Sequence, residues 1–595
     1  MESIASFLKF VFRYRKGIVD KVMLYVSMIS TLTVVIHVGY ITNPNFAEYT
    51  QQAILYMFYG LFFLELIRTG SSIYASRRIN VSQYSGVIVV NCLLFIFIAR
   101  TSSADFLTYF ARDEWMYFGI GIIFLSELSK SSLFFDNFYF NPTILFVLSF
   151  IGLILIGTLL LMLPRTTLHA PLSLIDALFM ATSAVCITGL SVTDISTNFS
   201  LFGQSVILAL IQIGGLGIMT FTGFFGYFFS GGFSFKNQLM FGEILGERKL
   251  NSVISTLLTI ISITLLFEMI GAAFIFFSLN EAHFENVGQQ VFFSVFHSVS
   301  SFCNSGFTIL PDGIGHEYYR YNYAFQIVLA LIFVLGGMGF GTVYNFYTYV
   351  KSQVQALIQA IIRKKMYKHK AQAFSFNTRF IVLCNMVVLF LATVSYYFME
   401  QGFSLTGDTS VAGEWATSFF MANASRSAGF NSVNINFLNI PTLIMVTTLM
   451  WIGVAPGSTG GGVKVTTVAL SVMNILALAR GKESIEIFKR RIAAESVSKA
   501  FAIIVLSVLT ITFSFVLLNF TDPDKEMIPL LFETVSAYST CGLSMGVTQS
   551  LSPAGKIIII TTMFVGRVGM LTLLVAFIKN TKNKSYIYPT EKLLF

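Results

Sequence analysis

Four short polar segments of the sequence each end on a glycine, and they recur at nearly even spacing. The glycines are Gly189, Gly306, Gly429 and Gly542, separated by 117, 123 and 113 residues, and each segment lies between long apolar runs. A repeat of fixed period indicates a structural unit that is used several times. In a membrane protein, four such loops around one axis can offer backbone carbonyl oxygens that replace the hydration shell of a cation. The pattern therefore predicts a cation path.

The residues predicted to hold the ion are the three that close each segment. Inward-pointing carbonyls require backbone angles that a Cβ opposes, which is the reason for glycine. One such glycine alone would more often mark a helix packing point or a turn, but four at matched positions favour a common filter. The predicted filter residues are Ile187, Thr188, Gly189, Asn304, Ser305, Gly306, Ser427, Ala428, Gly429, Thr540, Cys541 and Gly542.

The composition restricts the class of protein. Of the 595 residues, 55% are hydrophobic and 11% are charged, whereas about a quarter of the residues of a soluble protein are charged. The chain is therefore expected to be a polytopic protein in contact with membrane lipid. Its net charge of +9 could point to nucleic acid, but the basic residues gather in loops between apolar runs, so no nucleic-acid partner is expected.

Apolar runs long enough to cross a bilayer as helices must position these loops. They lie near 22–41, 52–68, 84–99, 115–133, 143–163, 204–228, 253–279, 323–350, 378–399, 441–478, 497–519 and 553–578. Shorter runs near 173–187, 290–303, 413–426 and 529–540 cannot cross and are predicted to be re-entrant helices. The predicted fold is all-α. Four repeats of helix, re-entrant pore helix, filter loop and helix surround a pseudo-fourfold axis, preceded by about four extra transmembrane helices.

The same repeats set the expected domain boundaries. An N-terminal accessory transmembrane region is expected over 1–142, and it is not predicted to sense voltage because none of its helices carries Arg or Lys at every third position. The four pore repeats are expected over 143–230, 231–350, 351–478 and 479–595. The third of these has a broken second helix, and the last includes the C-terminal tail.

The distribution of basic residues predicts the topology. The linkers 229–252, 351–380 and 479–499 contain three, seven and six Lys or Arg, whereas each predicted re-entrant region contains one. Cytoplasmic loops carry the excess of basic residues. The linkers and the basic N-terminus are therefore expected in the cytoplasm, and the four glycine loops on the outside.

Three motifs resemble the Trk/Ktr/HKT superfamily of potassium transporters. They are Thr182-Ser183-Ala184-Val185-Cys186-Ile187-Thr188-Gly189-Leu190, Ser425-Arg426-Ser427-Ala428-Gly429-Phe430-Asn431 and Pro456-Gly457-Ser458-Thr459-Gly460-Gly461-Gly462-Val463-Lys464. The resemblance covers about 143–578 and implies a pseudo-tetrameric pore for K⁺ in the cell (inner) membrane, with K⁺ held at the filter residues and no covalently bound cofactor. It also implies a homodimer and a cytosolic ring of nucleotide-binding (RCK-type) regulatory subunits. In plant relatives, serine at the first filter glycine accompanies sodium transport, so glycine at all four positions favours potassium.

Two departures from the repeat suggest a gate. Arg567 stands where the first two repeats have Gly215 and Gly337, and a guanidinium in mid-membrane is costly enough to suggest a function in the ion path. The alternative is an arginine paired with a neighbouring carboxylate or carbonyl. Members of the superfamily carry an arginine at this position, usually with proline where this chain has Met570, so the local helix shape stays open.

The second departure is a helix-breaking run in the third repeat. Proline removes a backbone donor and glycine disfavours helix, so a break at membrane depth is expected. The resemblance implies that this break forms an intramembrane loop that blocks the pore until the regulator moves it, with Lys464 as a tether to carbonyls. A phosphate-binding loop is the weaker alternative. With Arg567, the predicted gating residues are Pro456, Gly457, Ser458, Thr459, Gly460, Gly461, Gly462 and Lys464.

A gated potassium-selective pore is the function that these features favour. The alternative is a Na⁺- or H⁺-coupled potassium symporter, for which Glu268 and Glu533 are the available carboxylates within or near the core spans. An enzyme is not expected, because the six His, five Cys and the carboxylates show no catalytic or metal-binding spacing.

Overall fold

The structure is a computed structural model. It describes all residues except 1–15, 41–43, 76–80, 102–111, 131–141, 217–252, 280–283, 312, 364–373, 408–409, 483 and 578–595. The described residues form two compact units. The first contains α2–α5 together with the short η3 helix, and the second contains α6–α24 with one small β-hairpin.

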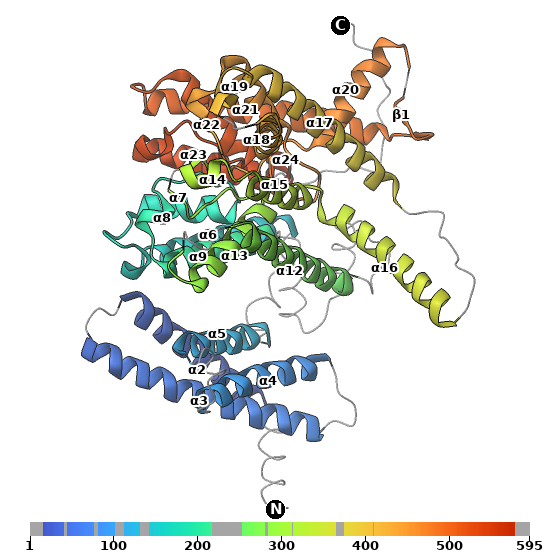
Figure 1. Ribbon diagram of the computed structural model, residues 1–595. Helices are drawn as coiled ribbons and strands as arrows, with labels where there is room; N and C mark the ends of the chain where they lie inside the picture. Colours follow the sequence, from blue (N-terminus) through green and yellow to red (C-terminus); the bar gives the residue numbers. More distant parts are fainter. Residues whose placement is uncertain are drawn as a thin grey trace, which may run out of the picture. The chain divides into compact units, whose positions relative to one another are not determined.

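The first unit is a bundle of four apolar helices (blue in Figure 1). They are α2 (Lys16–Tyr40), α3 (Pro44–Ala75), α4 (Val81–Thr101) and α5 (Asp113–Lys130), with η3 (Pro164–Thr166) beside α2. Phe58, Leu93 and Ile120 are fully buried among these helices. The Arg68 guanidinium donates to both carboxylate oxygens of Glu127, at 2.7 and 2.5 Å, and also contacts Glu65. The charged groups of the bundle thus pair near the helix ends.

The second unit contains the predicted pore region. Its longer helices are α6 (Pro142–Leu161), α7 (Leu174–Val185), α9 (Leu201–Gly215), α12 (Val253–Ser278), α13 (Val287–Phe302), α15 (Tyr323–Gly337), α16 (Phe340–Arg363), α17 (Phe376–Glu400), α18 (Val411–Ala424), α19 (Ile440–Ile452), α20 (Val465–Ala479), α21 (Ala494–Thr521), α22 (Met527–Ser539), α23 (Pro553–Val568) and α24 (Met570–Phe577). Its short elements are α8 (Ile195–Asn198), α14 (Glu317–Arg320), η6 (Gly313–Gly315), η7 (Ser404–Gly407), η8 (Ile435–Phe437), η9 (Thr548–Ser550), β1 (Glu486–Ile487) and β2 (Arg490–Arg491).

Four short helices, α7, α13, α18 and α22, each follow a longer one and lead into a glycine loop. They have 12 to 16 residues, fewer than the roughly 20 that a membrane-spanning helix needs. Three of them start at a polar side chain that accepts a backbone N–H of the first turn, from Ser173, Asn286 and Ser410. Such N-caps fix where a helix begins.

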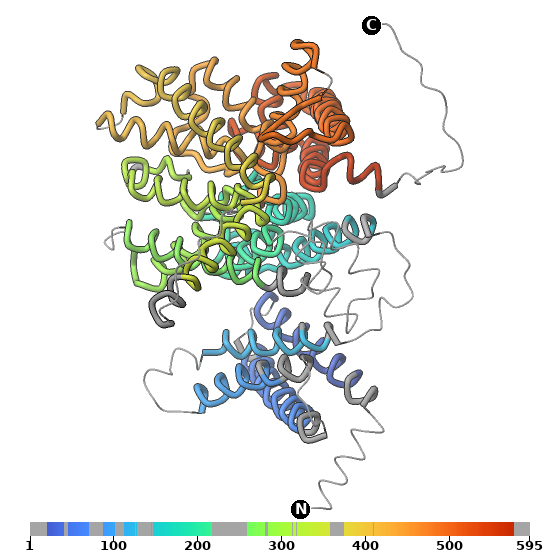
Figure 2. The backbone as a smooth tube through the Cα atoms, turned by 90° about the vertical axis from the view of Figure 1, so that its right-hand side faces the viewer, coloured from blue at the N-terminus to red at the C-terminus, as the bar shows by residue number. Residues whose placement is uncertain are grey.

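These short helices pack in a closed order. The helix after each glycine loop contacts the short helix of the next segment, in the pairs α9–α13, α15–α18 and α19–α22. The last pair, α23–α7, connects the end of the chain to the beginning of this unit, and both views show the red and cyan segments side by side (Figures 1 and 2). The four glycine loops are therefore held by one cyclic arrangement of helices.

The helices that follow three of the loops are broken. A break was expected only in 441–478, where α19 and α20 are indeed separate. The run 323–350 was expected to be one helix, but α15 and α16 meet at 98° beside Gly339, whose φ is +85°. The run 553–578 is interrupted at Gly569 (φ +86°), so the two uninterrupted spans were wrong. In both places a glycine in the left-handed region ends the helix.

Helix lengths agree with a protein of several membrane spans. By length and composition, five of the described helices could cross a membrane, or six if the bent α15–α16 pair is one span. Shorter apolar helices occupy other predicted runs, and the part of the run 204–228 beyond Leu216 lies outside the described residues. α16 continues to Arg363, past the predicted boundary at 350, and the other domain boundaries stay predictions.

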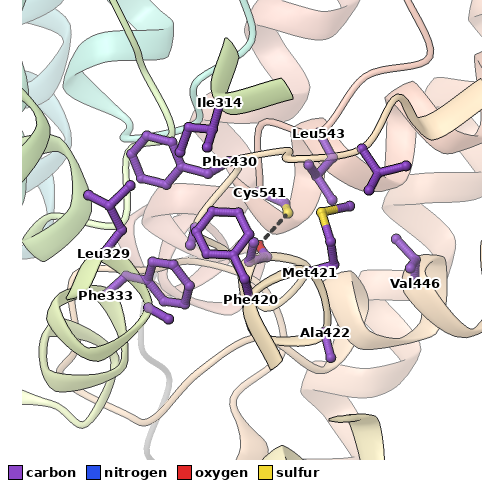
Figure 3. Close-up of a cluster of buried hydrophobic side chains, with 14 of the residues drawn as sticks. Ile314, Leu329, Phe333, Phe420, Met421, Ala422, Phe430, Val446, Cys541 and Leu543 are labelled. Carbon is purple, nitrogen blue, oxygen red and sulfur yellow. Dashed lines mark hydrogen bonds between the residues drawn. The ribbon is translucent and has the colours of Figure 1, made fainter. Parts of the chain in front are cut away.

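Aromatic side chains pack behind the loops. Figure 3 shows Phe333 of α15, Phe420 of α18 and Phe430 of the third glycine loop in one buried cluster. The Phe333 ring centroid lies 5.8 Å from that of Phe420 and 6.5 Å from that of Phe430. Buried aromatic contacts of this kind hold a loop firmly against its helices.

Candidate functional site: a ring of four glycine loops

The four loops share an unusual backbone conformation. The residue two positions before each glycine has a positive φ, and so does the glycine itself. The φ values are +57° for Ile187, +56° for Asn304, +75° for Ser427 and +47° for Thr540, and +87°, +73°, +75° and +93° for Gly189, Gly306, Gly429 and Gly542. Residues with a Cβ rarely adopt this region. The same strained conformation at four matched positions indicates a common structural requirement.

Each glycine faces the backbone of the next loop. A Cβ at Gly189 would collide with the carbonyl oxygen of Ser305, and one at Gly306 would lie 2.7 Å from the Cα of Gly429. A Cβ at Gly429 would collide with the carbonyl oxygen of Cys541. At Gly542 the collision would be with Thr188 O, which returns to the first loop. The four loops therefore meet around one centre, where only hydrogen fits at these Cα atoms.

The loop N–H groups point back into the short helices. Thr188 N donates to Ser183 O and Ser305 N to Ser300 O, both at 2.8 Å. Cys541 N donates to Ser536 O at 2.9 Å, and Gly429 N to Ala424 O at 3.1 Å. Because a trans peptide places its C=O opposite its N–H, the preceding carbonyls point away from the helices. The partly negative C-termini of all four helices also end here, so the ring suits a cation.

Buried hydroxyl groups add oxygen atoms beside this ring. The side chains of Ser183, Thr188, Ser305 and Ser539 are buried, and their hydroxyls have no hydrogen-bond partner within the described part of the chain. The Ser300 hydroxyl instead donates to Phe307 O at 2.7 Å and so holds the second loop. Unpartnered buried hydroxyls are costly without a water or an ion.

One glycine in each of three helices that follow the loops has a packing role. A Cβ at Gly214, Gly336 or Gly566 would collide with the carbonyl oxygen of a residue at the end of a short helix. Those residues are Val185, Phe302 and Tyr538. The absence of a side chain therefore lets each of these helices approach its short helix closely. At Gly215 a Cβ would collide with Cys303 Sγ, so this position is also filled.

Arg567 joins three parts of the unit. Its guanidinium donates to the Thr459 carbonyl oxygen and to the Gly214 carbonyl oxygen, the latter at 2.9 Å. These contacts place the side chain of α23 between the end of α9 and the segment that joins α19 to α20. Both acceptors are carbonyls, as in the alternative considered from the sequence. Arg567 thus holds that segment in place.

The segment between α19 and α20 contacts the glycine loops directly. The Thr459 hydroxyl donates to Phe302 O at 3.2 Å, and Gly461 N donates to Ser427 Oγ at 3.2 Å. The Ser427 hydroxyl in turn donates to Thr540 O at 3.0 Å. Hydrogen bonds therefore connect the segment to the ends of the second, third and fourth short helices.

Further hydrogen bonds hold the same segment. Lys464 Nζ donates to Gly460 O at 2.6 Å and contacts Gly461 O at 3.5 Å. Phe340 N donates to Gly457 O at 2.9 Å, at the bend between α15 and α16. The predicted gating residues are therefore gathered in one place: this segment lies beside Arg567 and in contact with the loops.

Arg426 was not among the predicted site residues, although it is the only Lys or Arg in 400–440. Its side chain is 5% exposed and donates to Asn385 Oδ1 at 2.6 Å and to Gly453 O at 3.2 Å. Because it directly precedes Ser427, it ties the third loop to the start of the α19–α20 segment. The signal in the sequence was a lone basic residue inside an apolar re-entrant region.

The two carboxylates considered for ion coupling lie behind the ring. Glu268 of α12 is 5% exposed, and both of its carboxylate oxygens accept from Gln212 Nε2 at 3.0 Å. Glu533 of α22 is fully buried and accepts from the hydroxyls of Ser544, at 2.8 Å, and Thr548. Each carboxylate is thus held by neutral donors next to a short helix, and neither lies in the ring itself.

A cyclic set of strained loops inside apolar helices defines a class: multi-pass helical membrane proteins that carry ions or small solutes. The chain belongs to the TrkH family of cation transport proteins, because the sequence model of this family matches residues 118–587. Proteins of this family are transporters, and the chain is not an enzyme.

Named relatives and one solved structure agree with this family. The chain is 33% identical to "Ktr system potassium uptake protein B" of Bacillus subtilis over 451 residues, covering 76% of this chain and 96% of that protein. It is 34% identical to the protein of the same name from Vibrio alginolyticus, covering 72% and 89%. "Potassium/sodium uptake protein NtpJ" of Enterococcus hirae is 32% identical, covering 76% and 97%. The crystal structure of the potassium transporter TrkH from Vibrio parahaemolyticus shares the fold, with a TM-score of 0.58 and 16% identity over 84% of this chain and 97% of that one.

Proposed function

We propose that the chain carries K⁺ into the cell through a gated, potassium-selective pore in its second unit. The observation that carries this proposal is the closed ring of four loops, in which each glycine faces the backbone of the next. Relatives named as potassium uptake proteins support K⁺ as the ion. The proposed ion ligands are the backbone carbonyls of the twelve predicted filter residues, since such carbonyls can replace the hydration shell of K⁺.

The α19–α20 segment and Arg567 form the proposed gate. The segment lies against the ends of three short helices, and the Arg567 guanidinium places a positive charge beside it. A fixed cation next to the path opposes the passage of K⁺. Opening then requires Thr459 O to leave the Arg567 guanidinium and Gly461 N to leave Ser427 Oγ, and a cytosolic RCK-type regulatory ring is the proposed trigger.

The proposed topology follows the basic linkers. Their Lys and Arg residues favour a cytoplasmic position, which places the N-terminus inside and the glycine loops outside the cell membrane. A homodimer is proposed as the assembly, with the regulatory ring on the cytoplasmic side. The pore itself is proposed to consist of four repeats around a pseudo-fourfold axis. Their approximate bounds are 143–230, 231–350, 351–478 and 479–595.

A coupled symporter is the second candidate, because one buried carboxylate lies close to the second loop. Glu268 Oε1 is 3.9 Å from the thiol sulfur of Cys303, the residue before Asn304. A carboxylate at membrane depth is by default a candidate for ion coupling. Coupling would require transport to depend on a Na⁺ or H⁺ gradient.

The proposal is tested by rubidium uptake in bacterial cells that lack their own potassium uptake systems. We expect cells with the chain to accumulate Rb⁺ and to grow at limiting K⁺. Cells with the Gly306→Ser variant should do neither, because its Cβ would meet Gly429. Gly402 also has a positive φ, but its Cβ position is open, so Gly402→Ser is a matched control. Equal uptake by both variants would reject the carbonyl ring as the ion path.

A further inference from the structure

A tight hairpin joins α20 to α21. In residues 485–492, Glu486 pairs with Arg491 and Ile487 with Arg490, so Phe488 and Lys489 form a two-residue turn. Both turn residues have positive φ values, +48° and +61°. A two-residue turn with two positive φ values is type I′, for which Asn-Gly is the preferred sequence. This hairpin instead places an aromatic and a basic side chain where the backbone disfavours them.

The hairpin has a buried side and an exposed tip. Ile485 and Ile487 are buried in a cluster with Val465 of α20 and Phe380 of α17. The tip residues Phe488, Lys489, Arg490 and Arg491 are exposed, and Phe488 is 49% exposed. The buried isoleucines therefore fix the position of a tip that presents one aromatic ring and three positive charges. Strained residues that persist in a well-fixed element are found at binding surfaces.

A second aromatic ring supports the tip. The Phe376 ring at the start of α17 lies 6.0 Å from the Phe488 ring, edge to face, and 5.9 Å below the Arg490 guanidinium. Only one acidic residue, Glu486, occurs in 485–492. The tip thus combines two aromatic rings with an excess of positive charge.

The position of the hairpin in the chain indicates which part of the membrane it contacts. It connects two apolar helices, α20 and α21, and α21 is long and apolar enough to cross a membrane. A short connection between such helices lies at the boundary between membrane and water. Aromatic rings favour that boundary, and Lys and Arg there bind anionic headgroups.

We propose that the hairpin tip is a binding surface for anionic phospholipid headgroups. Lys489, Arg490 and Arg491 would contact the phosphates, and Phe488 would lie at the level of the glycerol groups. Bound lipid would also influence the position of the gate segment, and this consequence rests on the proposed function. The chain runs from Lys464, which holds the gate segment, through α20 to this hairpin.

The test measures binding of phosphatidylglycerol to the purified full chain in neutral detergent. The readout is native mass spectrometry, and phosphatidylcholine is the comparison lipid. The combined variant Lys489→Gln, Arg490→Gln and Arg491→Gln should bind phosphatidylglycerol at least about tenfold more weakly, because each basic residue near a charged surface contributes measurably to attraction. The matched control Arg480→Gln, Lys482→Gln and Lys499→Gln removes three exposed charges from the same linker. It should change binding by less than about twofold.

A second variant separates lipid binding from folding. Phe488→Asn with Lys489→Gly creates the preferred turn, so the melting temperature should stay the same or rise while phosphatidylglycerol binding falls. Unchanged lipid binding in the three-charge hairpin variant would overturn the proposal. Equal losses of phosphatidylglycerol binding in the hairpin and control variants would also overturn it. So would a hairpin variant that keeps phosphatidylglycerol binding and loses only its binding to an acidic cytosolic protein. None of these measurements depends on ion transport.

Discussion

At the scale of single residues, the site depends on backbone angles. The four glycines could be predicted because their even spacing is visible in the sequence. The positive φ values of Ile187, Ser427 and Thr540 could not, because these residue types rarely adopt a conformation that the surrounding packing imposes. Arg426 was likewise visible as a residue, but its partner Asn385 is distant in sequence and is brought to it only by the fold.

Replacing the first filter glycine tests the ring at this scale. Gly189→Ser places a Cβ against Ser305 O at a φ of +87°. We expect the ratio of K⁺ to Na⁺ flux to fall by about tenfold, because strain of order 1–3 kcal/mol at one residue is comparable with that change. Flux ratios in liposomes measure it, with Gly402→Ser as control. An unchanged ratio would mean that the four loops do not form one filter.

Replacing Glu268 tests whether the carboxylate couples transport to another ion. Glu268→Gln keeps the shape of the side chain and an acceptor for Gln212 Nε2, but it cannot ionise or exchange a proton. A carbonyl-lined pore needs no ionisable group at this place, so K⁺ flux without a Na⁺ or H⁺ gradient should stay within about twofold of the wild type. The measurement is flux with and without each gradient. A variant that abolishes gradient-dependent uptake would favour the symporter.

At the scale of elements, the sequence predicted one broken helix and missed two. Pro456 and the adjacent glycines announce a break between α19 and α20. Gly339 and Gly569 each stand within an apolar run that reads as continuous helix, and only their positive φ values reveal the bends. Gly569 ends α23 directly before Met570. The proline usual in the superfamily at that position is therefore not needed for the break.

Removing the Arg567 charge should favour the open gate. Arg567→Gln weakens the contacts with Thr459 O and Gly214 O, and a hydrogen bond to a charged group contributes about 1.5–3 kcal/mol. We therefore expect K⁺ flux to rise by about tenfold or more, measured in liposomes. Arg379→Gln, at an exposed arginine of α17, is the control. Flux equal to that of the wild type would remove Arg567 from the gate.

Shortening the α19–α20 segment should abolish closure. Deletion of Gly457–Gly461 removes the donor to Ser427 Oγ and the acceptors of Arg567 and Lys464. We therefore expect K⁺ to leak from loaded liposomes without a regulator, and the leak rate is the measurement. Thermal unfolding of the variant shows whether the helices remain assembled. A folded variant that still retains K⁺ would reject the segment as a gate.

At the scale of the whole molecule, composition and apolar runs were enough to predict a helical membrane protein. The first unit could be predicted only as a group of helices, because its sequence carries none of the motifs of the pore region and most of it lies before the family match at 118–587. Its buried Arg68–Glu127 pair joins α3 to α5, 59 residues apart in sequence. Such a pairing depends on tertiary packing, which no local pattern shows.

The closed ring predicts how the whole molecule carries ions. The most direct test is ion flux into liposomes that contain the purified chain alone, with K⁺ or Na⁺ as the permeant cation and a proton ionophore for charge balance. We expect K⁺ flux that exceeds Na⁺ flux and that needs no Na⁺ or H⁺ gradient. Flux that does not distinguish K⁺ from Na⁺, or that appears only with such a gradient, would contradict a potassium-selective pore.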